Sequence, residues 1–86
     1  MKIKEGFVLR EIAGQYVAVP VGRDINLDMM ITLNETGHML WQRLEQEAEF
    51  GDLVDALMKE YGIDRNTATE HVTAFINKLK ENNFVE

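Results

Sequence analysis

The sequence of 86 residues contains no cysteine and no serine. Without cysteine there is no disulfide framework, no thiol nucleophile and no thiolate ligand for a metal ion. Without serine the commonest hydroxyl nucleophile is missing as well. The absence of disulfides fits a reducing compartment. Together these absences exclude covalent catalysis by cysteine or serine and zinc sites built from cysteine.

Long apolar runs and glycine-rich loops are also missing. No stretch approaches the ~20 apolar residues that a membrane span requires. The N-terminal stretch has Lys2 and Lys4 but no apolar run after them, so it does not resemble a signal peptide. The six glycines are scattered at turns, so none of them forms a phosphate-binding loop. We therefore expect a soluble, cytoplasmic protein.

Charge is unevenly distributed along the chain, whose formal net charge is −6. Residues 1–34 hold four cations and four anions, whereas residues 35–86 hold five cations and eleven anions. The second part should therefore repel polyanions. Nucleic-acid affinity depends largely on Lys and Arg that neutralise phosphates, so this charge pattern argues against DNA binding.

The first third of the chain predicts three short strands, over about residues 6–12, 15–21 and 29–33. The first two runs are rich in strand-forming residues, and Ala13-Gly14 between them supplies a hairpin turn. Pro20 cannot donate to a strand ladder, so it should lie at a strand end or at an edge.

The remaining residues predict three helices, over about 35–45, 51–61 and 65–82. Asn34 and Asp64 are good N-caps for the first and third helices, and Gly62 is a typical helix end. Apolar residues recur at helical spacing, and we expect Trp41 to fill the centre of the core. The order of elements indicates a single α+β domain over residues 1–86, with a small antiparallel sheet and three helices in a winged-helix-like arrangement.

No motif indicates catalysis. The two histidines, His38 and His71, are far apart in the sequence and in no metal-ligand spacing, so we interpret them as surface or boundary residues. The abundant acidic pairs are typical of solvated helix faces and caps. We therefore predict that the chain is not an enzyme, has no catalytic or metal-binding residues and needs no cofactor.

The third predicted strand is the feature that points to a function. A three-stranded sheet cannot close, so at least one edge stays unpaired, and the candidate is residues 29–33, which carry no Pro, Lys or Glu to protect them. An extended peptide could add to this edge as a further strand. Three alternatives stay open: Met29 and Met30 are simply core residues, the chain's own N-terminus covers the edge, or a second copy pairs with it to form a homodimer.

The blocks "MITLNETGHMLWQRL", "FGDLVDALMKEYGID" and "VTAFINKLKENNFVE" resemble the PqqD-like family. Its founding members act in pyrroloquinoline quinone biosynthesis, and the resemblance covers roughly residues 6–85. The family consists of small winged-helix domains called RiPP recognition elements. The resemblance implies that the chain binds the leader segment of a ribosomally synthesised precursor peptide and presents it to a modifying enzyme, often a radical SAM enzyme. It does not distinguish quinone biosynthesis from other peptide pathways.

The resemblance also implies where the leader docks. The leader would add to the third strand, and its side chains would enter a cleft beside the third helix, where Lys80 would pair with an acidic leader residue. Met29 stands where the family often has a small residue. Two other functions remain as alternatives: a winged-helix regulator that binds nucleic acid, and a scaffold subunit that docks only on a partner enzyme. The implied peptide-binding residues are Met29, Met30, Ile31, Thr32 and Leu33 on the strand, and Thr69, Val72, Thr73, Ile76, Asn77 and Lys80 on the helix.

Overall fold

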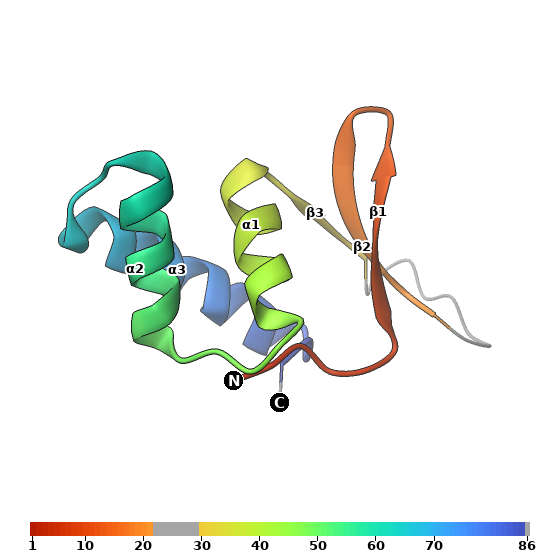
Figure 1. The fold of residues 1–86 in the computed structure, drawn as a ribbon. Coiled ribbons are helices and arrows are strands. Elements are labelled where there is room, and N and C mark those ends of the chain that lie inside the picture. Colours follow the sequence, from red (N-terminus) through yellow and green to blue (C-terminus); the bar gives the residue numbers. More distant parts are fainter. Residues whose placement is uncertain (22–29, 86) are drawn as a thin grey trace.

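A computed structural model describes residues 1–21 and 30–85 of the chain. In it three antiparallel strands are followed by three helices, which confirms the predicted α+β fold. The helices lie together on one side of the small sheet, and the third strand leads directly into the first helix (Figure 1). In chain order the elements are β1 (Phe7–Ile12), β2 (Gln15–Pro20), β3 (Ile31–Leu33), α1 (Glu35–Leu44), α2 (Phe50–Tyr61) and α3 (Arg65–Glu81).

The predicted hairpin forms from β1 and β2. Their antiparallel register begins at Phe7 opposite Pro20 and closes at Ile12 opposite Gln15. The two residues between, Ala13 and Gly14, both have positive φ angles, of 51° and 79°. Positive φ at both central positions is the signature of the type I′ turn, whose twist matches that of the two strands it joins.

The strand β3 is shorter than predicted, because it begins at Ile31 rather than at residue 29. Met30 precedes the strand, and Met29 lies outside the described residues. The strand pairs with β2 through three positions, from Ala18 opposite Ile31 to Tyr16 opposite Leu33. The ladder cannot extend much further, since Pro20 ends β2 and has no backbone N–H to donate.

The helix ends follow the predicted caps. Asn34 Oδ1 accepts a hydrogen bond from the Gly37 amide at 2.7 Å, and Asp64 Oδ1 accepts one from the Thr67 amide at 2.7 Å. Gly62 ends α2 with a left-handed φ of 64°. The observed helix bounds differ from the predicted ones by a single residue at three ends. No helix among residues 1–21 and 30–85 has the length and apolar character needed to cross a membrane.

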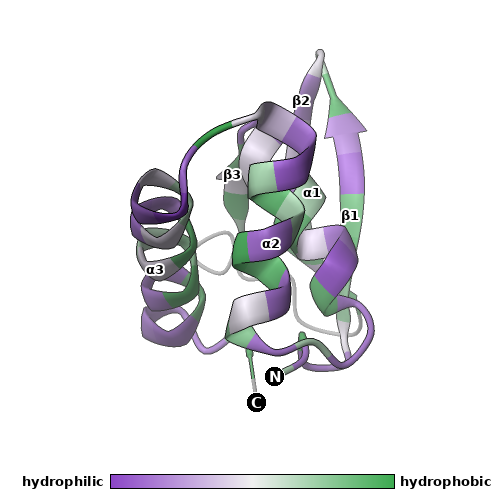
Figure 2. Ribbon diagram, turned by 60° about the vertical axis from the view of Figure 1, so that its left-hand side comes forward, coloured by the Kyte–Doolittle hydropathy of each residue, from purple (hydrophilic) through white to green (hydrophobic). Residues whose placement is uncertain are grey.

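Trp41 lies at the centre of the core, as predicted, with 1% of its surface exposed. Its indole meets the ring of Phe84 edge-on at a centroid distance of 5.7 Å, and Phe84 in turn packs against Phe7 of β1 at 4.4 Å. Figure 2 shows the apolar side of α3 turned toward the other helices. The apolar residues of α3 that recur at helical spacing are all buried: Ala68, Val72, Phe75, Ile76 and Leu79.

The N-terminal segment lies beside the C-terminal segment, so the two ends of the chain are close together (Figure 1). Ile3 forms a bridge with Val85, and its amide donates to the Leu44 carbonyl at 2.8 Å. The residues that precede β1 therefore pack against the ends of α1 and of the chain. They do not pair with β3, which rules out the alternative in which the N-terminus covers this edge.

Candidate functional site

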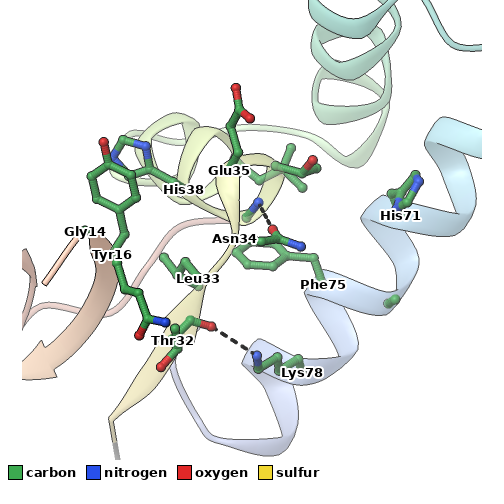
Figure 3. Close-up of a pocket in the computed structure, with 15 residues that line it drawn as sticks. Gly14, Tyr16, Thr32, Leu33, Asn34, Glu35, His38, His71, Phe75 and Lys78 are labelled. Atoms are coloured by element: carbon green, nitrogen blue, oxygen red, sulfur yellow. Dashed lines mark hydrogen bonds between the residues drawn. The ribbon is translucent and has the colours of Figure 1, made fainter. Parts of the chain in front are cut away.

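A groove of about 920 Å³ opens beside β3. Figure 3 shows that β3 and α3 form its two long walls, while the start of α1 forms the corner between them. The end of the β1–β2 hairpin closes one side. The lining residues are Gly14, Gln15, Tyr16, Thr32, Leu33, Asn34, Glu35, Thr36, Gly37, His38, Leu40, His71, Ala74, Phe75 and Lys78.

The backbone of Thr32 faces this groove. Its carbonyl accepts a hydrogen bond from Lys78 Nζ on α3 at 3.4 Å, so it points away from β2 (Figure 3). In an antiparallel pair the N–H and C=O of one residue point to the same side, and neighbouring residues point to opposite sides. Thr32 therefore directs both polar groups outward, whereas Ile31 and Leu33 direct theirs toward β2. Within the part of the chain that the structure describes, β2 is the one strand that pairs with β3.

The corner between β3 and α1 is tightly packed. Asn34 caps α1 and thereby turns the chain from strand to helix without a loop. Gly37 sits against α3, since a Cβ atom built there would lie 3.2 Å from Cε1 of Phe75 and 3.2 Å from Oδ1 of Asn34. A side chain at position 37 would therefore press on the Phe75 ring and on the Asn34 cap, and these neighbours would have to shift by a few tenths of an ångström. The glycine lets the two walls of the groove meet at its base.

An aromatic stack stands at the hairpin side of the groove. The rings of Tyr16 and His38 lie almost parallel, 5° apart, with their centroids separated by 3.6 Å. The stack joins β2 to α1 and faces the α3 wall, from which His71, Phe75 and Lys78 project (Figure 3). His38 is half-buried and His71 is exposed, in agreement with the predicted boundary and surface positions.

The predicted binding residues on the strand coincide partly with the groove. Thr32 and Leu33 line it, whereas Ile31 is buried on the inner face of the sheet and Met30 is half-buried before the strand. On α3 the lining residues are His71, Ala74, Phe75 and Lys78, and none of them belongs to the predicted set. Val72 and Ile76 are core residues, and Thr69, Thr73, Asn77 and Lys80 are half-buried or exposed on other parts of the helix. Peptide contact by these six helix positions stays a prediction.

Several lining residues were not identified from the sequence. Tyr16, Glu35, His71 and Lys78 line the groove but do not belong to the binding residues that the resemblance implied. One signal was present: His71, Ala74 and Lys78 follow one another at spacings of three and four residues, so they share one flank of the buried stripe of α3. Helical periodicity alone does not tell which of the two polar flanks faces β3.

The groove combines an open backbone edge with an apolar floor and a few charges. Phe75 and Leu33, which are 9% and 4% exposed, supply a small apolar surface, and Glu35 and Lys78 supply charges of opposite sign. Among residues 1–21 and 30–85 no three His, Cys, Asp or Glu side chains gather closely enough to hold a metal ion. This combination suits an extended chain, whose backbone can bond to the edge while alternate side chains enter the groove.

Two solved structures resemble this chain over nearly its whole length. The first, "TbiB1 in Complex with the TbiA(beta) Leader Peptide", is 26% identical, with a TM-score of 0.79 over 100% of this chain and 95% of that one. The second, "Lasso peptide synthetase B1 complexed with the leader peptide", is 24% identical, with a TM-score of 0.75 over 96% of this chain and 93% of that one. A comparison with curated protein sequences gave no significant match.

A protein-family model also matches the chain. Its description is coenzyme PQQ synthesis protein D, and the match runs from residue 15 to residue 85. The matched region contains β2, β3 and all three helices, and therefore both long walls of the groove. This chain belongs to the PqqD family.

Proposed function

We propose that this chain is a non-catalytic module that binds the leader segment of a ribosomally synthesised precursor peptide. The leader adds to β3 as a further antiparallel strand, and the module presents it to a modifying enzyme. The observation that carries this proposal is the outward-facing backbone of Thr32 at a groove between β3 and α3. Strand addition to such an edge gives affinity through main-chain hydrogen bonds and specificity through side-chain pockets.

Membership of the PqqD family and the two similar structures support the proposal. Both structures are of proteins bound to leader peptides, and their chains match this one almost end to end. The shared fold would set the same strand edge beside the same helix. The leader-binding role is thus consistent with the family, with the fold and with the geometry of the groove.

The proposed binding mode assigns different tasks to the two walls. Thr32 would exchange backbone hydrogen bonds with the guest strand, and Met30 would extend the contact at the entry to β3. Every second side chain of the guest strand would then enter the groove over Phe75. On α3 we propose His71, Phe75 and Lys78 as the positions that face the peptide. The family resemblance implied a different set of helix positions, which includes Lys80. Mutation of residues from each set can distinguish the two.

The enzyme that receives the peptide would act outside this chain. A small module that holds one part of a peptide leaves the rest free to reach a separate active site. We propose a peptide-modifying enzyme as this partner, with a radical SAM enzyme as the first candidate. No cofactor is needed for strand addition, because backbone hydrogen bonds and apolar contacts supply the affinity.

Leader binding can be measured by fluorescence anisotropy. The probe is a labelled synthetic leader from a precursor peptide encoded beside this gene. We expect the wild-type protein to bind it with a micromolar or lower Kd. Thr32→Pro removes the outward N–H and should abolish binding, whereas Thr32→Val keeps the N–H and the side-chain shape and should retain it. Unchanged binding by folded Thr32→Pro protein would refute strand addition.

A peptide-modification assay with the partner enzyme distinguishes this proposal from a scaffold role. The enzyme is incubated with the precursor and with either wild-type or Thr32→Pro protein, and modified peptide is measured by mass spectrometry. A presenting module predicts that the variant binds the enzyme but no longer supports modification. Full modification with the Thr32→Pro variant would instead favour a scaffold that contacts the enzyme alone.

A further inference from the structure

The edge of β3 is not bare in the free protein. Lys78, on the exposed side of α3, reaches across the groove and donates from Nζ to the Thr32 carbonyl at 3.4 Å (Figure 3). This carbonyl is the acceptor that an added strand would use. The distance is long for a hydrogen bond from an ammonium group, so the interaction is weak and a backbone N–H can displace it. Lys78 Nζ thus occupies the place that a backbone N–H of an added strand would take.

We propose that Lys78 decides which chain adds to β3: its ammonium occupies the outward Thr32 carbonyl and disfavours a second copy of this protein, and it yields that carbonyl to a guest strand that carries a carboxylate within its reach. The first half concerns the protein alone. The second half rests on the leader-binding function proposed above.

A second copy is disfavoured for a reason of symmetry. Two antiparallel β3 strands related by a twofold axis would place Thr32 opposite Thr32 of the other copy, and each would exchange both backbone bonds with the other. Each Lys78 would then have to leave its Thr32 carbonyl or share it with the incoming N–H, and the two ammonium groups would be brought toward each other. Two strands of three residues each would form few new backbone hydrogen bonds to compensate for this loss. A lysine at an open edge is a known means of preventing edge-to-edge pairing.

A leader peptide meets a different situation, because it brings no second Lys78. Its N–H would compete with Nζ for the Thr32 carbonyl, and the exposed ammonium, once displaced, could bind a new acceptor on the guest. A carboxylate on the guest strand supplies one as a charge-assisted hydrogen bond. The overall charge of −6 acts in the opposite direction and repels an acidic peptide, so the contact with Lys78 has to outweigh this repulsion. Lys78 therefore favours an acidic guest over a neutral one.

Self-association tests the first half. Amide chemical shifts are followed with increasing protein concentration for wild type, Lys78→Met and Lys80→Met. Lys80 is the matched control, since it is exposed on the same helix and does not line the groove. We expect concentration-dependent shifts at β3 in Lys78→Met alone. Association should strengthen by at most about fivefold for each Lys78 hydrogen bond that the substitution removes, because fivefold corresponds to an ordinary net hydrogen bond of ~1 kcal/mol and these bonds are long and weak. Adding Thr32→Pro should abolish these shifts.

Two outcomes would overturn this half: Lys78→Met protein that self-associates no more than Lys80→Met protein, or wild type that already pairs through β3.

Peptide discrimination tests the second half. The labelled leader is compared with a version in which each Asp and Glu is replaced by Asn or Gln. Wild type and Lys59→Met, a control on α2 whose exposed lysine does not line the groove, should prefer the acidic version severalfold, and Lys78→Met should lose this preference. Discrimination that survives in Lys78→Met would overturn this half. If wild type binds neither version, the proposed function fails while the self-association result still decides the first half.

Discussion

Gly37 of α1 rests against the ring of Phe75 on α3, so closely that a Cβ atom at position 37 would lie 3.2 Å from Cε1 of that ring. This close approach joins the two helices at the base of the groove. It also lies next to the Asn34 cap, since the same Cβ would lie 3.2 Å from Oδ1 of Asn34. The tight packing at the base of the groove therefore depends on the absence of a side chain at position 37.

Gly37→Ala should gain less stability than a matched glycine replacement elsewhere. Alanine in a helix is favoured over glycine by ~1 kcal/mol, but at position 37 the new methyl group would press on Phe75 and Asn34. The control is Gly51→Ala in the first turn of α2, where a Cβ atom meets nothing within 4 Å. In urea denaturation we expect Gly51→Ala to stabilise the protein and Gly37→Ala to be about 1 kcal/mol less stable than this control. Equal gains would show that the packing at Gly37 is loose.

Trp41→Ala should destabilise the domain by about 3–5 kcal/mol, because the indole is almost fully buried and contacts Phe84. In a domain of this size such a loss is a large part of the total stability. Trp41→Phe keeps part of the volume and should cost clearly less. Circular dichroism during urea denaturation measures both variants. A destabilisation below about 1 kcal/mol for Trp41→Ala would contradict the central position of this residue.

Asp64 should make stability depend on pH in acid. Hydrogen bonds from the backbone and side chain of Thr67 lower the pKa of Asp64 below its ordinary value of 3.8. A carboxyl group with a lowered folded pKa contributes fully above the unfolded pKa, and the contribution is lost as the pH falls through the folded pKa. Asp64→Asn keeps a capping side chain without the charge. The Tm advantage of wild type over this variant should be constant near neutral pH and should shrink as the pH falls below 3.8. An advantage independent of pH would contradict the assignment.

Proline substitutions should distinguish the two sides of β3. Ile31 is paired with Ala18 and directs its N–H to β2, so Ile31→Pro leaves a buried acceptor unpaired at a cost of about 1–3 kcal/mol beyond that of Ile31→Ala. Thr32 directs its N–H outward, so Thr32→Pro should differ little from Thr32→Ala in the free energy of unfolding. Denaturant titration of the four variants tests this alternation. A larger backbone cost at Thr32 than at Ile31 would reverse the inferred orientation.

Most of the fold could be predicted from the sequence because its signals are local. The Ala13-Gly14 turn fixed the hairpin, Asn34 and Asp64 fixed two helix starts, and the spacing of apolar residues identified the buried stripe of α3. The predicted start of β3, at residue 29, was wrong by two residues, since the strand begins at Ile31. Its length depends on the partner strand, which ends at Pro20, and this pairing is not local information.

The site was only partly predictable. The open edge followed from the number of strands, and Thr32 and Leu33 were identified with it. The helix positions implied by the resemblance are not the ones that line the groove, because both flanks of the buried stripe are polar and the sequence does not distinguish them. The lining residues on α3 are His71, Ala74, Phe75 and Lys78. The choice between them depends on how α3 crosses the sheet, which is a property of the packing. The Tyr16–His38 stack brings two elements together and likewise has no local signal.

The most direct test of strand addition is an N-methyl scan of the leader peptide, with the Kd for the wild-type protein measured at each position. In an added strand every second residue directs its N–H to the neighbouring strand, and the residues between direct theirs to solvent. N-methylation should therefore weaken binding strongly at alternate positions of the segment that docks beside Thr32, and weakly at the positions between. A pattern of weakened binding without this two-residue period, or unchanged binding at every position, would contradict the account.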